Sequence, residues 1–256
     1  MAMSPEVQQA RRGQFTASQF YRLMGHGSKT HETCEWSTEY TCYEKVKVDD
    51  SYEYVPLQEP PKKKALWRKI TNYLPDGADT YIIEKVTELL DTEQVESYTS
   101  ISMQYGIDTE PQAMQAIQDK YGVELAHIND EQVFFSNGEY GATPDGVEYA
   151  PDLYTITVVH DVKCPIGTTH TFNILKVKTA ADLEKHYPVY YWQLIGQMLC
   201  TGATIAQWHS YRPQHESNPL HTVIVPRDEQ KINALKHRLE LAIARKNQYL
   251  EILKGI

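Results

Sequence analysis

This sequence lacks a long apolar run and a secretory leader. No stretch approaches the ~18–20 apolar residues that a membrane-spanning helix needs, and the first six residues, Met1 to Glu6, lack the basic and apolar regions of a signal peptide. Cysteine is also scarce. The four cysteines form neither a Cys-x-x-Cys motif nor a zinc-type ladder with histidine. We therefore expect a cytoplasmic protein with reduced thiols and no membrane partner.

Acidic residues outnumber basic residues, and the net charge is −9. This counts against a nucleic-acid partner, because contacts to phosphate need lysine and arginine. Binding nevertheless depends on where basic groups cluster rather than on their sum. Basic groups cluster at Arg11-Arg12 and within residues 62–69, although a solvated loop explains the second cluster equally well. The net charge therefore does not exclude DNA as a partner.

The length and composition are those of one ordinary globular domain. The chain has 256 residues, of which 41% are hydrophobic and 23% charged, and this suits a single core. We predict one domain over residues 1–256, with an insertion or flap at about 28–66, where the pattern is irregular. A long C-terminal helix is expected at about 227–254.

Hydrophobic periodicity predicts alternating helices and strands. Helices are expected over residues 17–24, 67–73, 78–90, 100–121 with a break near Pro111, 186–201 and 227–254. Strands are expected over residues 124–128, 132–136, 140–149, 154–163, 204–211 and 220–225. The order helix, strands, helix, strand indicates an α/β fold with a mixed sheet flanked by helices.

The candidate catalytic residues lie in the middle third. Asp161 and Lys163 are two apart in the most strand-like segment, so both side chains should project from one face. Asp145 lies about a hairpin's length earlier, in the turn Pro144-Asp145-Gly146. A plain turn and a simple ion pair would explain these residues singly. Together they fit a site in which two carboxylates hold Mg²⁺ and a lysine orients or deprotonates water, which is the chemistry of phosphodiester hydrolysis.

Each of the other polar residues has a structural and a functional interpretation. Glu110 lies on an expected helix, where a solvated face is the default. Tyr190, Gln193 and Gln197 share one face of a later helix, which is either solvated or lines a polar cleft. Gly196 lies within that helix and weakens it by about 1 kcal/mol relative to alanine. Close packing or a closely approaching ligand would account for it.

Near the N-terminus, Arg11 precedes Thr16 and Ser18, either of which can cap a helix. A helix N-terminus beside an arginine is a ready phosphate pocket, and an ordinary cap is the alternative. Taken in order, these segments resemble the phage lambda-type exonucleases, also called YqaJ-like viral recombinases, of the PD-(D/E)XK nuclease superfamily. One such motif is weak, but five in order are specific. They are Arg11-x-Gly13-x-x-Thr16-Ala-Ser18, Gly106-x-x-x-Glu110, Pro144-Asp145-Gly146, Asp161-x-Lys163-Cys-Pro165 and Tyr190-x-x-Gln193.

The resemblance, which runs patchily from Arg11 to about Tyr211, implies a restriction-endonuclease-like core. It implies a Mg²⁺-dependent 5′→3′ exonuclease that degrades one strand of linear double-stranded DNA in phage or prophage recombination, with Mn²⁺ as a substitute metal. The implied partners are double-stranded DNA ends, a single-strand annealing protein and further copies of the chain in a ring-shaped trimer, all in the bacterial cytoplasm. A ring also answers the charge objection, since only its channel need be basic.

The resemblance also implies a role for each residue of the metal site. Asp145, Asp161 and the carbonyl group of Val162 would hold the metal ions. Glu110 would contribute through water or a second ion, and Lys163 would position the attacking water. The family commonly has glutamate where this chain has Asp161, but aspartate is accepted across the superfamily.

For DNA, the resemblance implies that Arg11, with Ser18, binds the 5′-phosphate. Gln193 would orient the site and the substrate, and Tyr190 and Gln197 would face the DNA. The family often carries a second glutamine where this chain has isoleucine at position 195, so that Gln197 substitutes for it or the position is dispensable. Two alternatives remain: a structure- or site-specific endonuclease of the same fold, or a catalytically silent protein that binds DNA ends. The intact acidic pair and lysine argue against the second.

Overall fold

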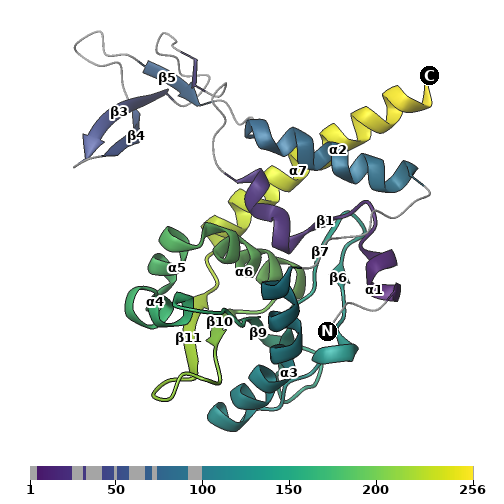
Figure 1. Cartoon of the computed structure of the whole chain (residues 1–256). Coiled ribbons are helices and arrows are strands. Elements are labelled where there is room, and N and C mark those ends of the chain that lie inside the picture. The colour runs from purple at the N-terminus through teal and green to yellow at the C-terminus, as the bar shows by residue number, and fades with distance from the viewer. Residues whose placement is uncertain are drawn as a thin grey trace.

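A mixed four-stranded sheet forms the centre of the computed structural model, which describes residues 5–24, 31–32, 42–48, 51–57, 67–70, 74–91 and 100–255. Its strands are β8 (Gly146–Tyr149), β9 (Ile156–Lys163), β10 (Ile205–Tyr211) and β11 (Leu220–Pro226), in the order β11-β10-β9-β8. β9 and β10 are parallel, and the other two pairings are antiparallel. The expected α/β fold with a mixed sheet is therefore confirmed (Figure 1).

Strand β9 separates two hydrophobic cores. Val159 packs in the larger core with Leu194 of helix α6 (Pro188–Thr201). Val162 packs in the smaller core with Met114 of helix α3 (Ile101–Tyr121). Alternate residues of a strand point to opposite faces, so Asp161 and Lys163 share the face of Val159 and point toward α6. The sheet thus directs the candidate catalytic pair toward one particular helix.

A second, smaller sheet joins the N-terminal motif to the centre of the chain. It consists of β1 (Phe15–Thr16), β7 (Tyr140–Ala142) and β6 (Phe135–Ser136), in the order β1-β7-β6. β1 and β7 pair in parallel, with Thr16 opposite Gly141. Helix α1 (Pro5–Ala10) precedes this sheet, and the 3₁₀ helix η1 (Ala17–Leu23) follows β1. The segment that carries Arg11 and Ser18 therefore lies beside the strand that leads to Asp145.

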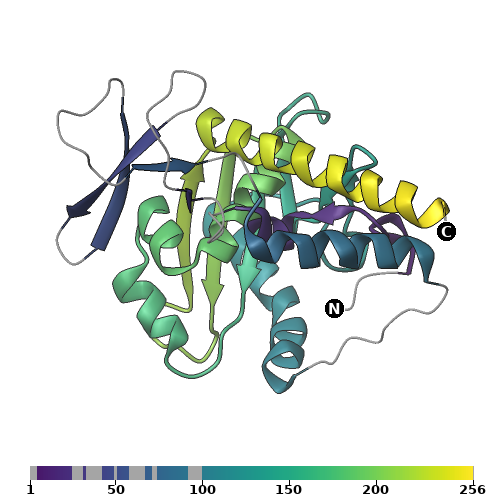
Figure 2. The ribbon, with the colours of Figure 1, turned by 90° about the horizontal axis from the view of Figure 1, so that it is seen from above.

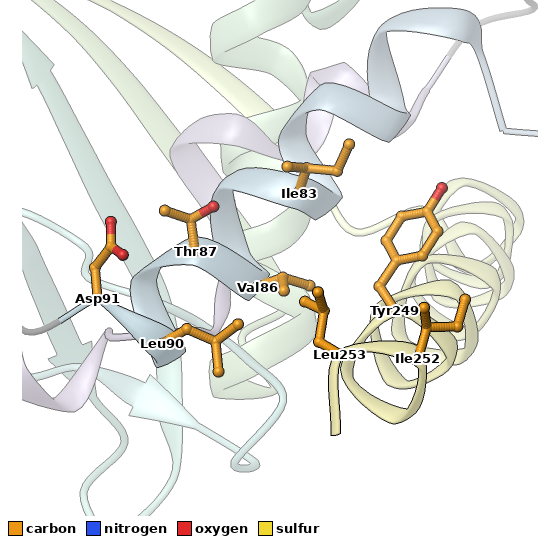
Figure 3. A pocket seen from close by; sticks show the side chains of 8 residues that line it. All are labelled: Ile83, Val86, Thr87, Leu90, Asp91, Tyr249, Ile252 and Leu253. Carbon is orange, nitrogen blue, oxygen red and sulfur yellow. The ribbon is translucent and has the colours of Figure 1, made fainter. Parts of the chain in front are cut away.

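Helices α2 (Asp76–Leu90) and α7 (Glu229–Lys254) lie side by side in both views of the ribbon (Figures 1 and 2). Asp79 of α2 accepts a hydrogen bond from the Tyr249 hydroxyl group of α7 at 2.7 Å. A hollow of about 320 Å³ lies between them (Figure 3) and contains none of the predicted site residues. Its lining is Ile83, Val86, Thr87, Leu90, Asp91, Tyr249, Ile252 and Leu253. The apolar residues of α2 are only partly buried, since Val86 is buried whereas Ile83 is 48% exposed.

Part of the predicted insertion forms a separate four-stranded sheet. Its strands are β2 (His31–Glu32), β3 (Cys42–Val48), β4 (Ser51–Leu57) and β5 (Trp67–Ile70), in the order β2-β5-β3-β4. The helix expected over residues 67–73 is wrong, because residues 67–70 form a strand that pairs with both β2 and β3. Residues 71–73 lie outside the described part of the chain. Pairing with distant strands overrides a short helical pattern.

Other expected elements differ in detail. The strand expected over residues 124–128 is wrong, since only Ala126 makes a bridge, to Val147. Residues 132–136 contribute only the two-residue strand β6. Helix α3 runs unbroken through Pro111, with buried residues on both sides of it. Two short helices, α4 (Thr169–Lys176) and α5 (Ala180–His186), were not expected. Within the described ranges, every helix is too short or too polar to cross a membrane.

Gly196 marks the point where α6 meets the N-terminal 3₁₀ helix. A β-carbon built on Gly196 would lie 2.4 Å from Cδ2 of Phe20 and 3.0 Å from Cβ of Ala17. Phe20 is fully buried, so its ring has no free space to move into. Close packing, rather than a ligand, therefore accounts for this glycine.

We expect Gly196→Ala to lower the free energy of unfolding by about 1–3 kcal/mol, because an extra methyl group in a packed core forces neighbouring groups to shift. Gly106→Ala is the matched control, since Gly106 also lies in a helix and its added β-carbon would meet nothing within 4 Å. That control should gain up to about 1 kcal/mol from helix propensity. Urea denaturation followed by circular dichroism measures both, and equal stability of the two variants would contradict the packing argument.

Candidate active site

Asp161 and Lys163 form an ion pair at the end of β9. The Lys163 Nζ atom lies 2.7 Å from Oδ2 of Asp161. The Asp161 side chain is fully buried, whereas the Lys163 side chain keeps 26% of its exposure. The amine can therefore reach a molecule from solvent while it neutralises a carboxylate that solvent cannot reach. The expectation that both side chains share one face is confirmed.

Two glutamines of α6 hold the other oxygen of this carboxylate. Gln193 donates a hydrogen bond from Nε2 to Oδ1 of Asp161 at 2.6 Å, and Gln197 donates to the same oxygen at 3.3 Å. The polar stripe of α6 therefore lines a polar site rather than facing solvent. Ile195, where the family often has glutamine, is fully buried in the core. Gln197 contributes the second amide contact to Asp161, which Ile195 cannot make because it has no polar side-chain atom.

Asp145 lies against the backbone of β9. Its Oδ2 accepts a hydrogen bond from the Val162 amide group at 2.7 Å, and its own amide group donates to the His160 carbonyl group at 3.0 Å. The turn at Asp145 is thus pinned to the strand segment that carries Asp161. The Asp145 carboxylate therefore lies against the amide group of the residue that follows Asp161.

The charges of this site act on one another. Burial raises the pKa of Asp145 well above its ordinary value, and the negative charge of Asp161 raises it further. Burial alone would lower the pKa of Lys163, but the charges of Asp161 and Asp145 outweigh it and raise that pKa. The amine therefore carries its proton at neutral pH. Crowded carboxylates with a raised pKa are typical of functional sites.

Glu110 enters the same environment from α3. Burial raises its pKa, and the neighbouring charges of Lys163 and Asp161 act on it in opposite directions. The Gln132 amide group donates to Oε1 of Glu110 at 3.3 Å. Gln132 was not predicted from the sequence. A polar residue that precedes the apolar pair Val133-Phe134 is the one local feature that sets it apart. The three carboxylates thus influence one another across the site.

The donor set fits a hard divalent cation. Mg²⁺ prefers oxygen ligands and commonly uses one or two carboxylates together with water. Oε1 of Gln197 is buried and accepts no hydrogen bond from the described residues, whereas Oδ2 of Asp161 is paired with the Lys163 amine. In this conformation, no three acidic, cysteine or histidine side chains among the described ranges lie together as a ready-made metal cluster. The carboxylates of Asp145 and Asp161 match this ligand set, in which water molecules would complete the coordination of the ion.

The structure gives the two N-terminal arginines different surroundings. Arg12 donates hydrogen bonds to the carbonyl groups of Glu88 and Asp91, which caps the C-terminus of α2. The Arg11 guanidinium carbon lies 5.8 Å from the centre of the Phe134 ring, and burial lowers the pKa of Arg11. Arg12 therefore caps a helix, and the phosphate contact predicted for Arg11 stays a prediction.

Phe134, which sequence reasoning missed, links the Arg11 segment to the catalytic strands. A β-carbon built on Gly141 would lie 2.4 Å from Cζ of Phe134, so the ring packs directly on the backbone of β7. Gly141 pairs in turn with Thr16. Ser18, half-buried in η1, lies two residues beyond Thr16. The predicted phosphate residues therefore lie on either side of β1.

The segment between Arg11 and Ser18 is clamped by two distant helices. The Gly13 amide group donates to Oε2 of Glu88 in α2 at 2.9 Å. The buried amine of Lys246 in α7 donates to the Gly13 carbonyl group at 3.0 Å and to Oε2 of Glu139 at 2.8 Å. No local pattern marks Lys246 for this role, because a lysine on a long helix normally faces solvent.

Tyr190 lies beside the amine of Lys163. The centre of its ring is 5.2 Å from Lys163 Nζ, and the ring stacks on Trp208 with 6.1 Å between centres. Trp208 is opposite Asp161 in the register of β9 and β10. Of the residues predicted for the site, Lys163, Asp161, Asp145, Gln193, Gln197 and Tyr190 are thus brought together, with Val162 and Glu110 at its edge.

Comparisons with known proteins bear on the fold and the family of the chain. The chain is similar in structure to LHK-Exo, an alkaline exonuclease from Laribacter hongkongensis solved alone and in complex with dAMP, with a TM-score of 0.67, 20% identity, and coverage of 98% of this chain and 97% of that chain. It is also similar to a phage-related exonuclease from Haemophilus somnus 129PT, with a TM-score of 0.60, 18% identity, and coverage of 94% and 96%.

At these identities the likeness establishes the fold, which is that of the PD-(D/E)XK alkaline exonucleases. No curated protein matches the chain. The model of the YqaJ-like viral recombinase domain matches residues 72–204, a span that includes Glu110, Asp145, Asp161, Lys163 and Gln193. By this match over more than half of its length, the chain belongs to the YqaJ-like viral recombinase domain family.

Proposed function

We propose that this protein is a Mg²⁺-dependent exonuclease that degrades one strand of linear double-stranded DNA from its 5′ end. One observation carries the proposal: the Asp161 carboxylate is fully buried, accepts hydrogen bonds from two glutamines and pairs with a partly exposed lysine. The amide group of the next residue, Val162, donates a hydrogen bond to the carboxylate of Asp145. A buried carboxylate is costly unless it is paired or binds metal. The family membership and the fold support the same chemistry.

Asp145, Asp161 and the carbonyl group of Val162 would hold Mg²⁺, with Glu110 reaching it through water. When bound, the ion would neutralise charge on the scissile phosphate and on the leaving 3′-oxygen. Mn²⁺ has the same preference for oxygen ligands and should substitute. The two carboxylates, together with the buried Oε1 of Gln197, which has no hydrogen-bond partner among the described residues, are the features that favour a cation here.

Lys163 would orient the attacking water. Its raised pKa keeps the amine protonated, so it would donate an N–H bond to the water oxygen and hold it in line with the scissile bond. Gln193 would fix the rotamer of Asp161 through its 2.6 Å hydrogen bond. Asp161 in turn places the Lys163 amine by the 2.7 Å ion pair. Rigid support of this kind reduces the entropy lost on reaching the transition state.

Arg11, with Ser18, would bind the 5′-phosphate of the strand end. The support for this is positional: β1 lies between these residues and pairs with β7, which precedes the Asp145 turn. An anchored terminal phosphate would place a neighbouring phosphodiester at Lys163 and define the polarity. DNA ends, a single-strand annealing protein, a ring-shaped trimer and a location in the bacterial cytoplasm belong to the same proposal.

Linear duplex labelled at either its 5′ or its 3′ end, together with closed-circular duplex, tests this function. With Mg²⁺ we expect rapid release of the 5′ label as a mononucleotide, late release of the 3′ label and an intact circle. EDTA should stop all release, and Mn²⁺ should restore it. Cleavage of the circle would contradict the proposal in favour of an endonuclease of the same fold.

A further inference from the structure

An aromatic strip extends from the catalytic amine across the surface. Tyr190 lies 5.2 Å from Lys163 Nζ, measured to the ring centre. The ring of Tyr187 follows, with 5.4 Å between ring centres and a 35° tilt. Phe172 comes next, 6.5 Å from Tyr187. The aromatic strip, defined by Tyr190, Tyr187 and Phe172, thus leads from the proposed site of cleavage to helix α4.

The inner part of the aromatic strip rests on a rigid base. Trp208 is 1% exposed and stacks under Tyr187 and Tyr190, with interplanar angles of 29° and 26°. The Tyr187 hydroxyl group donates a hydrogen bond to Oδ1 of Asn173 at 2.9 Å, which fixes the plane of that ring. Rings held in this way lose little conformational entropy when a flat ligand stacks on them.

The outer end of the strip is exposed although it is apolar. Phe172 is 39% exposed, and its ring meets the exposed His186 edge to face, with 5.5 Å between centres. Tyr187 and Tyr190 are half-buried. An aromatic ring at the surface beside a candidate active site has a ready use in stacking on a planar ligand.

The charge around the strip suits a polyanion, even though the whole chain is acidic. Lys176 lies one helical turn after Phe172, so both share a face of α4. Lys176, Lys178 and Lys185 are exposed. Helix α5 has two acidic residues, of which Glu184 pairs with Lys231, so that Asp182 alone offsets the three lysines. The outward charge of this surface is therefore positive.

We propose that Tyr190, Tyr187 and Phe172 form a base-stacking subsite for unpaired nucleotides of DNA next to Lys163. Stacking on aromatic rings needs free base faces, which single-stranded DNA offers and the interior of a duplex does not. The lysines would follow the phosphates while the rings take the bases. This inference rests on the proposed function for its substrate, and it adds which side chains of this protein would hold the bases.

The subsite can be tested by binding a fluorescein-labelled oligothymidylate in Ca²⁺, which should allow binding without cleavage. We expect Phe172→Leu to weaken this binding about five- to tenfold, because leucine keeps apolar volume but has no ring to stack. Phe172→Trp should restore it. Leu175→Ala is the control, since Leu175 is 60% exposed on the same helix and has no ring. Binding of blunt duplex ends should stay within about twofold in all variants.

A kinetic readout separates stacking from a general structural role. For linear duplex that carries an unpaired 5′ overhang, with Mg²⁺, Phe172→Leu should raise KM while leaving kcat nearly unchanged. Wild-type binding by Phe172→Leu, or equal weakening by Leu175→Ala, would overturn the subsite and leave the proposed nuclease intact. Weaker single-strand binding in Phe172→Leu, in a protein that degrades no DNA, would support the subsite and refute the nuclease.

Discussion

Lys163→Ala is expected to slow DNA degradation by about 10²–10⁴-fold, the range over which a positioned proton-bearing side chain contributes to catalysis. The variant leaves Asp161 buried without its 2.7 Å partner and leaves the attacking water without a donor. Arg11, Ser18 and the aromatic strip are untouched, so DNA ends should still bind. Single-turnover degradation with Mg²⁺ measures the rate, and fluorescence anisotropy in Ca²⁺ measures the binding.

Lys254→Ala is the matched control for that variant. Its side chain is 71% exposed, pairs only with Glu251 on the same helix and lies outside the site. It should keep wild-type activity. If wild type and Lys163→Ala degraded DNA equally poorly while both bound ends well, the chain would be a silent end-binding protein, and the catalytic role of Lys163 would be wrong.

Asp145→Asn is expected to abolish activity and to stabilise the metal-free protein at the same time. Activity should fall because the variant loses a carboxylate ligand for Mg²⁺. Stability should rise by about 0.5–2 kcal/mol, the usual gain when a residue kept for function is relieved of strain or repulsion. Asparagine can still accept the hydrogen bond from the Val162 amide group but no longer repels Asp161.

The gain should depend on pH in a definite direction. Burial and, to a smaller extent, the charge of Asp161 raise the pKa of Asp145 above its ordinary value. Between the ordinary and the raised pKa, the folded protein therefore binds a proton that the unfolded chain has released. The stability that this proton provides is fully present below the ordinary pKa of aspartate, about 4, and is lost as the pH rises from there through the raised pKa. The advantage of Asp145→Asn should therefore grow from about pH 4 upward.

Urea denaturation in EDTA at several pH values measures that advantage, and saturating Mg²⁺ should reverse the order, since a ligand that binds only the folded wild type stabilises it. Asp119→Asn is the control, because Asp119 is exposed and accepts only the amide group of Gln115. An advantage of Asp145→Asn that is constant with pH, or a loss of stability in EDTA, would contradict the crowding of charge at this site.

Local patterns alone predicted several parts of the molecule correctly. The alternation along β9 predicted that Asp161 and Lys163 share a face, and their ion pair confirms it. Gly122 and Gly202 end their helices in the left-handed conformation, as expected for glycine at a helix C-terminus. These features were predictable because strand pleat, helix period and glycine geometry act between residues that are close in sequence.

Other features depended on contacts between distant segments. The helical pattern at residues 67–70 became strand β5 because β3 supplied its partners. The clamp of Lys246 on Gly13, the packing of Phe134 on Gly141 and the stacking of Tyr187 on Trp208 have no signature in local spacing. Hydrogen bonding and burial, rather than propensity, select among short patterns once the chain is compact.

The sequence by itself therefore determined the chemistry of the site, since the acidic pair, the lysine and the glutamine stripe follow from residue type and period. Only the tertiary structure decided that Arg12 caps a helix while Arg11 lies against Phe134, that both Gln193 and Gln197 contact the carboxylate, and that an aromatic strip leads away from the amine. The physical reason is that such choices depend on register and crossing of distant elements, which local periodicity does not encode.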